Sequence, residues 1–202
     1  MYRLYDYLPS GNGYKVRLLL HQLGIPFELI ELDIVKGRTR TPEFLAKNPN
    51  GRIPTLEVEP GVFLPESNAI LFYLAEGTPF VPTDRLERAQ VLQWMCFEQY
   101  SHEPNIATVR FWVTHDLLTP ERRVQLEQKR ALGCAALGVM QQHLAARSFF
   151  VGERYSIADI ALYAYTHVAA EGGFDLAPYP AIGSWLERVH QQPRHVPITQ
   201  RG

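Results

Sequence analysis

The sequence predicts an α+β domain with the element order βαβαββα, followed by an all-helical domain. Alternating apolar runs that are typical of strands occur only in the first third of the chain. A segment rich in Gly and Pro, EGTPFVPTDR at 76–85, then interrupts the periodicity. Beyond it every periodic segment has helical spacing. We therefore expect an α+β domain at 1–76, a linker at 77–85 and a helical domain at 86–202.

The first domain begins with a βαβ unit. Tyr2 and Leu4 alternate with polar or amphipathic neighbours, which indicates a strand. The next apolar residues recur at helical spacing and stop at Gly24, a common residue after a helix end; they are Val16, Leu19, Leu20 and Leu23. The run FELIEL at 27–32 alternates again and predicts a second strand, parallel to the first.

The rest of this domain reads as a helix, a hairpin and a further helix. Residues 41–47 form a short helix candidate, and NPNGR at 48–52 has turn composition. The segment 54–64, PTLEVEPGVFL, contains two alternating runs joined by a Pro-Gly turn, which predicts a β-hairpin. ESNAILFYLA at 66–75 then predicts a helix.

The second domain is expected to be helical throughout. A long helix from about residue 86 to 115 contains Pro104, so we expect a kink there. Pro120 opens another helix, and Ser156 with Asp159 resembles a capping box at the start of a third. An apolar stripe marks the last helix, made by Ile182, Trp185, Leu186 and Val189.

Composition limits the partners and the compartment. The chain has 20 Lys and Arg against 21 Asp and Glu, a net charge of −1, so no basic surface is expected for nucleic acid or a membrane. No apolar stretch approaches the roughly 18 residues of a membrane span. The start of the chain lacks the apolar core of a signal peptide. With only two cysteines, both in predicted helices, a cytoplasmic protein is expected.

A metal site is not expected. None of the seven histidines lies three or four residues from another, and the two cysteines are far apart in sequence.

Three segments carry residues that could take part in ligand binding. The first is the loop before the first helix, where Ser10 and Asn12 could donate hydrogen bonds beside free backbone N–H groups. Both residue types are also common helix caps, so local sequence alone favours capping and function equally.

The second segment is Arg52-Ile53-Pro54, before the third strand, which decides nothing by itself because X-Pro bonds are mostly trans. The third is Glu66-Ser67, at the start of the helix at 66–75. There a hydroxyl and orphan N–H groups could hold a carboxylate while Glu66 takes an ammonium group. For this pair alone, helix capping is the favoured explanation.

Taken together, the chain resembles the cytosolic glutathione transferases over nearly its whole length. The motifs that carry the resemblance are SGNGYKVRLLL (10–20), NPNGRIPTLE (48–57), LPESNAILFYLA (64–75) and YSIADIALY (155–163). The loop resembles the serine-type and bacterial branch, similar to the nu-like and theta/zeta-like classes. The resemblance implies a thioredoxin-like first domain and an all-α second domain.

The resemblance also implies residue roles. Pro54 would be cis, the backbone of Ile53 would pair with the cysteinyl part of glutathione, and Arg52 would meet the glycyl carboxylate. Glu66 and Ser67 would hold the γ-glutamyl end. The implied glutathione-binding set is completed by the loop residues beside the sulfur, Ser10 and Asn12.

Thiol activation requires little from the protein. A free thiol has a pKa of about 8.5, and one good donor at a helix N-terminus stabilises the thiolate enough near neutral pH. Ser10 is the expected catalytic donor, with Asn12 as its partner or rival. Tyr5 fits poorly because it lies in a strand, and no cysteine in the loop could form a mixed disulfide.

The expected function is a homodimeric enzyme with glutathione as co-substrate. It would add the thiol to a small apolar electrophile, or reduce a peroxide or a disulfide. The electrophile pocket would lie between the domains, near Tyr100, Ile106 and Arg110, although a solvent-facing arginine is the simpler explanation of the last. The alternatives are a non-catalytic adaptor and a glutathione-dependent dehalogenase or isomerase.

Overall fold

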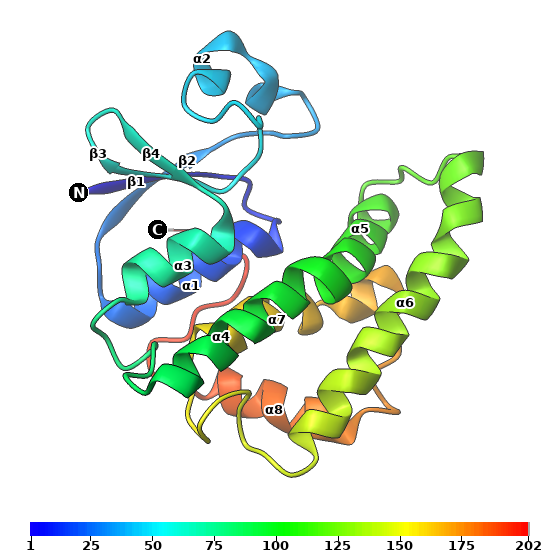
Figure 1. Cartoon of the computed structure of the whole chain (residues 1–202). Helices are drawn as coiled ribbons and strands as arrows, with labels where there is room; N and C mark the ends of the chain where they lie inside the picture. The colour runs from blue at the N-terminus through cyan, green and yellow to red at the C-terminus, as the bar shows by residue number, and fades with distance from the viewer. Residues whose placement is uncertain (202) are drawn as a thin grey trace. The chain divides into compact units, whose positions relative to one another are not determined.

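The computed structural model describes residues 1–201 and divides the chain into two compact units (Figure 1). The first unit comprises Met1–Thr78 together with the segment from Pro193 onward, and the second comprises Pro79–Gln192. The helical unit is therefore a continuous segment of chain, whereas the first unit is built from two.

A four-stranded mixed sheet forms the first unit, in the order β2-β1-β3-β4. Its strands are β1 (Tyr2–Asp6), β2 (Phe27–Glu31), β3 (Thr55–Glu59) and β4 (Val62–Pro65). The first two are parallel, as the βαβ pattern predicts, and β3 is antiparallel to both β1 and β4. Leu4 and Leu56 are opposite each other in the register and completely buried. The hairpin predicted from the Pro-Gly turn is confirmed.

Two helices, α1 (Gly11–Leu23) and α3 (Ser67–Ala75), lie side by side on one face of this sheet (Figure 1). The short α2 (Pro42–Leu45) lies on the other side, after a single 3-10 turn at Arg38–Arg40. α1 ends at Gly24, whose φ of 68° is left-handed and suits glycine. The order βαβαββα and the thioredoxin-like class are thus confirmed.

The second unit is all helical. It contains α4 (Arg85–Phe97), α5 (Glu103–Thr114), α6 (Pro120–Leu144), α7 (Ile157–Thr166) and α8 (Pro180–His190), with a 3-10 turn at Ala169–Gly172. None of the helices within residues 1–201 is long and apolar enough to cross a membrane.

The predicted capping box at the start of α7 is present. The hydroxyl of Ser156 accepts the N–H of Ala158, and the carboxylate of Asp159 accepts the N–H of Ser156. Asp159 also accepts the indole N–H of Trp185 at 2.9 Å, which ties α7 to α8. Complete burial raises the pKa of Asp159 to about 6, against its hydrogen bonds.

The prediction of a single helix kinked at Pro104 over 86–115 is wrong about how the chain accommodates the proline. The structure has a π-helical turn at Glu98–His102 between α4 and α5, and Pro104 lies in the first turn of α5. The N–H of Glu103 reaches the carbonyl of Glu98, five residues back. This wider turn adds a residue ahead of the proline, which removes the conflict between its ring and the preceding turn.

The segment after Pro193, expected within the helical domain, packs in the first unit. The hydroxyl of Tyr14 in α1 donates to the carbonyl of Val196 at 2.7 Å. Arg201 pairs with Glu31 at the end of β2, with 2.7 Å between Nη2 and Oε2. Because these contacts use backbone carbonyls and one exposed ion pair, the apolar periodicity of the sequence does not predict them.

Candidate active site

Three of the predicted segments meet at one edge of the sheet. Tyr5 is opposite Thr55 and Thr55 is opposite Pro65 in the strand register. The antiparallel pairing therefore brings the loop after β1, the residue before β3 and the residue after β4 to the same edge. Those positions are the start of the Ser10 loop, Pro54 and Glu66.

Ser10 is the N-cap of α1. Its Oγ accepts the N–H of Gly13 at 3.4 Å, a long hydrogen bond. Its own N–H donates to the carbonyl of Tyr7 at 2.8 Å, and its carbonyl accepts the N–H of Tyr14 at 2.9 Å. Capping uses the hydroxyl as an acceptor only. Since a hydroxyl can accept and donate at once, the two roles left open by the sequence are compatible.

Asn12 and Ser67 join the first turns of α1 and α3. The hydroxyl of Ser67 donates to Oδ1 of Asn12 at 3.3 Å, and the ammonium of Lys15 donates to the same hydroxyl at 3.4 Å. Ser67 is only 5% exposed and Lys15 is completely buried. Two of the predicted residues, 55 positions apart in sequence, thus share one hydrogen-bonded group.

The turn before β3 holds the second segment. The Ile53–Pro54 peptide bond is cis, as the resemblance implied. The side-chain amide of Asn48 donates to the carbonyl of Arg52 at 2.8 Å and to Oγ1 of Thr55 at 3.2 Å, so the turn is braced from both sides. The side chain of Arg52 is exposed, and Pro54 is buried.

Glu66 has an unusual backbone. Its φ is 72°, a left-handed value that costs a non-glycine residue on the order of 1–3 kcal/mol. It occupies the N-cap position of α3, and its own side chain makes no capping hydrogen bond. The exposed Glu66 carboxylate thus lies next to the N-terminus of α3, so an anion and an anion-binding helix end stand side by side.

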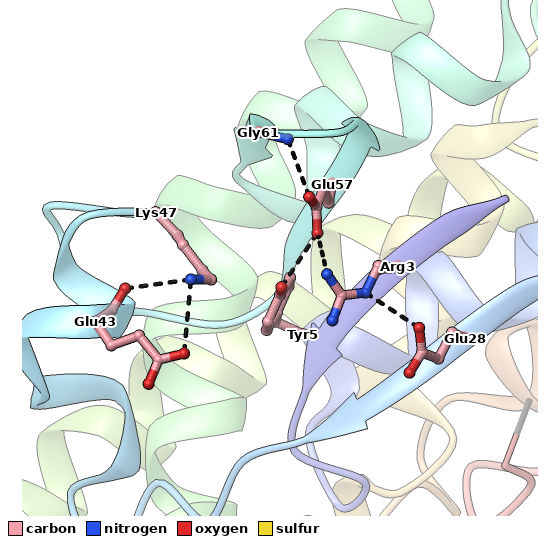
Figure 2. Close-up of polar contacts among 7 residues, drawn as sticks. All are labelled: Arg3, Tyr5, Glu28, Glu43, Lys47, Glu57 and Gly61. Carbon is pink, nitrogen blue, oxygen red and sulfur yellow. Dashed lines mark hydrogen bonds and ion pairs between the residues drawn. The ribbon is translucent and has the colours of Figure 1, made fainter.

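Tyr5, the only early tyrosine considered as a thiol activator, belongs to another cluster. Figure 2 shows its hydroxyl directed at Glu57, to which it donates at 3.1 Å. Oε2 of Glu57 also accepts from Arg3 at 3.0 Å, and Oε1 accepts the N–H of Gly61 at 3.0 Å. Burial, followed by the bond to Glu57, raises the pKa of Tyr5. Its hydroxyl is thus committed to bracing the β3–β4 hairpin.

Comparison with known proteins identifies the family. Residues 1–76 match the N-terminal domain of glutathione S-transferase, and residues 94–193 match the C-terminal domain of glutathione S-transferase. The chain belongs to the glutathione S-transferase family.

Three relatives show where in the family it lies. A crystal structure of a glutathione S-transferase from Pseudomonas fluorescens is 54% identical, covers 98% of this chain and 99% of its own, and has a TM-score of 0.96. Disulfide-bond oxidoreductase YfcG from Escherichia coli is 33% identical over 93% of this chain and 89% of that protein. A glutathione transferase family member from Pseudomonas fluorescens, solved with two glutathione molecules bound, is 29% identical with a TM-score of 0.82, covering 96% and 89% of the two chains.

In this family member the three residues expected near an electrophile pocket lie in different environments. Tyr100 is 87% exposed, on the π-helical turn. Ile106 is completely buried in the helical unit and so is core. Arg110 does not face solvent as the simpler explanation had it; its Nε and Nη2 bind one oxygen of Glu171 at 2.8 and 2.7 Å.

Within residues 1–201, no three His, Cys, Asp or Glu side chains lie close enough together to hold a metal ion.

One buried pair beside the Ser10 loop was missed by the sequence reasoning. Nε of Arg17 lies 3.0 Å from Oδ2 of Asp6, and both side chains are completely buried. The signal was a pair of cations, Lys15 and Arg17, on either side of Val16 in an otherwise apolar helix. Buried cations of this kind need partners, so their presence indicated a polar contact under the loop.

Proposed function

We propose that this transferase binds glutathione at the shared sheet edge and activates its thiol as a thiolate nucleophile. The observation that carries the proposal is the hydrogen bond from Ser67 to Asn12. It joins the loop that would lie beside the thiol to the helix that would hold the γ-glutamyl end, and this supports placing both subsites in one site.

The two charged ends of glutathione suit the groups found there. The γ-glutamyl carboxylate would lie at the N-terminus of α3 with Ser67, and the ammonium group would pair with Glu66. The exposed Arg52 would meet the glycyl carboxylate. The backbone of Ile53, held next to the cis Pro54, would pair with the cysteinyl unit.

The hydroxyl of Ser10 would donate a hydrogen bond to the thiolate while its oxygen continues to cap α1. A hydrogen bond to a charged group contributes about 1.5–3 kcal/mol, which corresponds to one or two pKa units of the thiol. Together with the helix N-terminus this is sufficient near neutral pH. Asn12, two residues along, is the other donor proposed for the sulfur.

Binding and turnover test this function separately. Titration calorimetry with glutathione should show saturable binding to the wild-type protein. A panel assay with an aryl halide, a hydroperoxide and a small disulfide, each with glutathione, then identifies the reaction. Absence of binding at millimolar glutathione, including on immobilised glutathione, would contradict the proposal and favour the adaptor alternative.

Disulfide reduction is the reaction that the relatives favour. YfcG is a disulfide-bond oxidoreductase, and another relative holds two glutathione molecules. A first glutathione thiolate would attack the disulfide, form a mixed disulfide and release one thiol. A second glutathione thiolate would attack the glutathione sulfur, release the other thiol and leave oxidised glutathione.

The stoichiometry of the products tests this reaction. One molecule of oxidised glutathione should appear for each disulfide consumed, with two glutathione molecules lost. Faster turnover of the aryl halide than of the disulfide would instead assign transfer as the main activity. The expected homodimer, and the electrophile pocket near Tyr100, Ile106 and Arg110, are proposals that sedimentation and substitution would test.

A further inference from the structure

The guanidinium of Arg17 is fully buried and binds four groups from three parts of the chain. Its Nε contacts Asp6 at the end of β1. Its Nη2 donates to the carbonyl of Leu8 at 2.7 Å. Its Nη1 donates to the carbonyls of Ile198 and Gln200, at 2.8 and 2.6 Å. Every nitrogen of the group is therefore used.

These bonds fix the backbone that leads to Ser10. Asp6 accepts the N–H of Tyr7 at 2.7 Å, and the carbonyl of Tyr7 accepts the N–H of Ser10 at 2.8 Å. With Leu8 bound to Arg17, the loop is held at each of its first two residues and again at the candidate thiol donor. Arg17 makes the contact to Leu8 directly and reaches Tyr7 through Asp6.

Asp6 is also packed against the first turn of α1 without spare room. A Cβ added to Gly13 would overlap the carboxyl group of Asp6. Gly13 is the residue whose N–H is accepted by the Ser10 hydroxyl. A shift of Asp6 or Arg17 would therefore be passed to both ends of the Ser10 cap, because close-packed groups move together.

We infer that Arg17 is a positioning residue for Ser10, and that the segment 196–200 takes part by holding the guanidinium in place. The inference rests on the proposed function, since it assumes that Ser10 acts on the glutathione thiol. The segment touches Arg17 through carbonyls and Tyr14 through Val196, so it closes over the same face of α1. Its loss would leave the guanidinium with Asp6 and Leu8 only.

The chemical reason is the directionality of a hydrogen bond to sulfur. A hydroxyl donor stabilises the thiolate only while its oxygen stays near the sulfur and its O–H points at it. Displacement of the loop weakens this bond without removing any group that touches glutathione. The affected quantity is the pKa of the bound thiol, rather than the affinity for the γ-glutamyl end.

The test is a pH titration of the thiol in the complex with glutathione, followed by the ultraviolet absorbance of the thiolate. Arg17→Lys keeps a cation beside Asp6 but cannot make the same set of bonds to three carbonyls. We expect it to raise the apparent thiol pKa by about one unit, which is about a tenfold loss of thiolate at lower pH. Removal of the chain from Val196 onward should change the thiol pKa in the same direction.

A second variant covers the case in which Arg17→Lys fails to fold. The double substitution Asp6→Asn with Arg17→Met removes both buried charges, so neither is left unpaired. Asn can still accept the N–H of Tyr7, but the anchor on Leu8 is gone. Circular dichroism and the unfolding midpoint establish that each protein is folded before titration.

The matched control is Arg3→Lys. Arg3 also lies in the first unit, and it pairs with Glu28 of β2 and Glu57 of β3 in the cluster of Figure 2. It should leave the thiol pKa unchanged. Folded Arg17 variants with the wild-type thiol pKa would overturn the inference while wild-type binding still supported the proposed function. Absence of glutathione binding by the wild-type protein would overturn both.

Discussion

The hydroxyl of Ser67 donates to the carboxamide oxygen of Asn12 across 3.3 Å, and so connects the first turns of two helices that begin at opposite ends of the first unit's sequence. Because Ser67 is 5% exposed, this bond is sheltered from water and more valuable than a surface one. The two residues should therefore act as a pair.

Substitution of either residue by Ala should weaken glutathione binding. We expect Ser67→Ala to raise the dissociation constant roughly tenfold or more, as for the loss of a hydrogen bond to a charged group. Asn12→Ala together with Ser67→Ala should cost less than the two single changes added, because the residues share a bond. Calorimetry of the four proteins measures this coupling. Ser184→Ala, a serine of α8 that bonds only locally to Pro180, is the control.

Ser10→Ala should lower glutathione turnover more than about tenfold and leave the fold intact. It should also cost about 1 kcal/mol of stability, since α1 loses its cap. Thr119→Ala separates the two effects, because Thr119 caps α6 in the same way through the N–H of Arg122. Near wild-type turnover of the Ser10 variant would assign thiol activation to Asn12 instead.

Glu66→Gly should stabilise the protein and weaken ligand binding at once. Glycine adopts the φ of 72° without strain, so the unfolding free energy should rise by about 1 kcal/mol. Glu66→Ala keeps the strain and should lose binding only. Chemical denaturation and calorimetry measure both quantities. Asp116→Gly, at another left-handed residue with φ of 51°, should gain stability and bind glutathione normally.

Stability should fall in acid through His167. Burial lowers the pKa of His167 to about 4, while its ring stacks on Tyr163 and bonds the carbonyl of that residue. The unfolded value is about 6.5, so the folded state binds fewer protons between these two values. The contribution is complete above pH 6.5 and is lost as the pH falls towards 4.

The measurement is the unfolding free energy of wild type and His167→Gln at pH 7 and pH 4.5. The wild type should lose about 2 kcal/mol more than the variant over this interval. Asp159, whose pKa is raised to about 6, acts in the opposite direction in both proteins and cancels in the comparison. Equal losses in the two proteins would show that His167 is not responsible.

Local patterns predicted most of the elements, because each has a local cause. The alternation of FELIEL, the Pro-Gly turn of the hairpin and the pairing of Ser156 with Asp159 all act over a few residues. The π-helical turn before Pro104 could not be found in this way. An apolar stripe tolerates one additional residue, so its period does not reveal where the residue is inserted.

The sequence motifs name candidate site residues, but they do not reveal the geometry that joins them. The motifs around Ser10, Pro54 and Glu66 indicated glutathione, whereas the bond from Ser67 to Asn12 depends on how α1 and α3 pack. The contact of Arg17 with the carbonyls of Ile198 and Gln200 is even harder to predict from the sequence. Any residue type supplies a carbonyl, so the sequence carries no mark of it.

The division of the first unit into two stretches of chain sets an order for its assembly. The ribosome delivers the amino terminus first, but Tyr14 and Arg17 obtain the carbonyls of Val196, Ile198 and Gln200 only after residues 79–192 have been made. At roughly 5–20 residues per second, that interval lasts several seconds. During synthesis the helical unit can thus be completed before the unit that precedes it, and a fragment ending at Thr78 would retain Arg17 with part of its contacts missing.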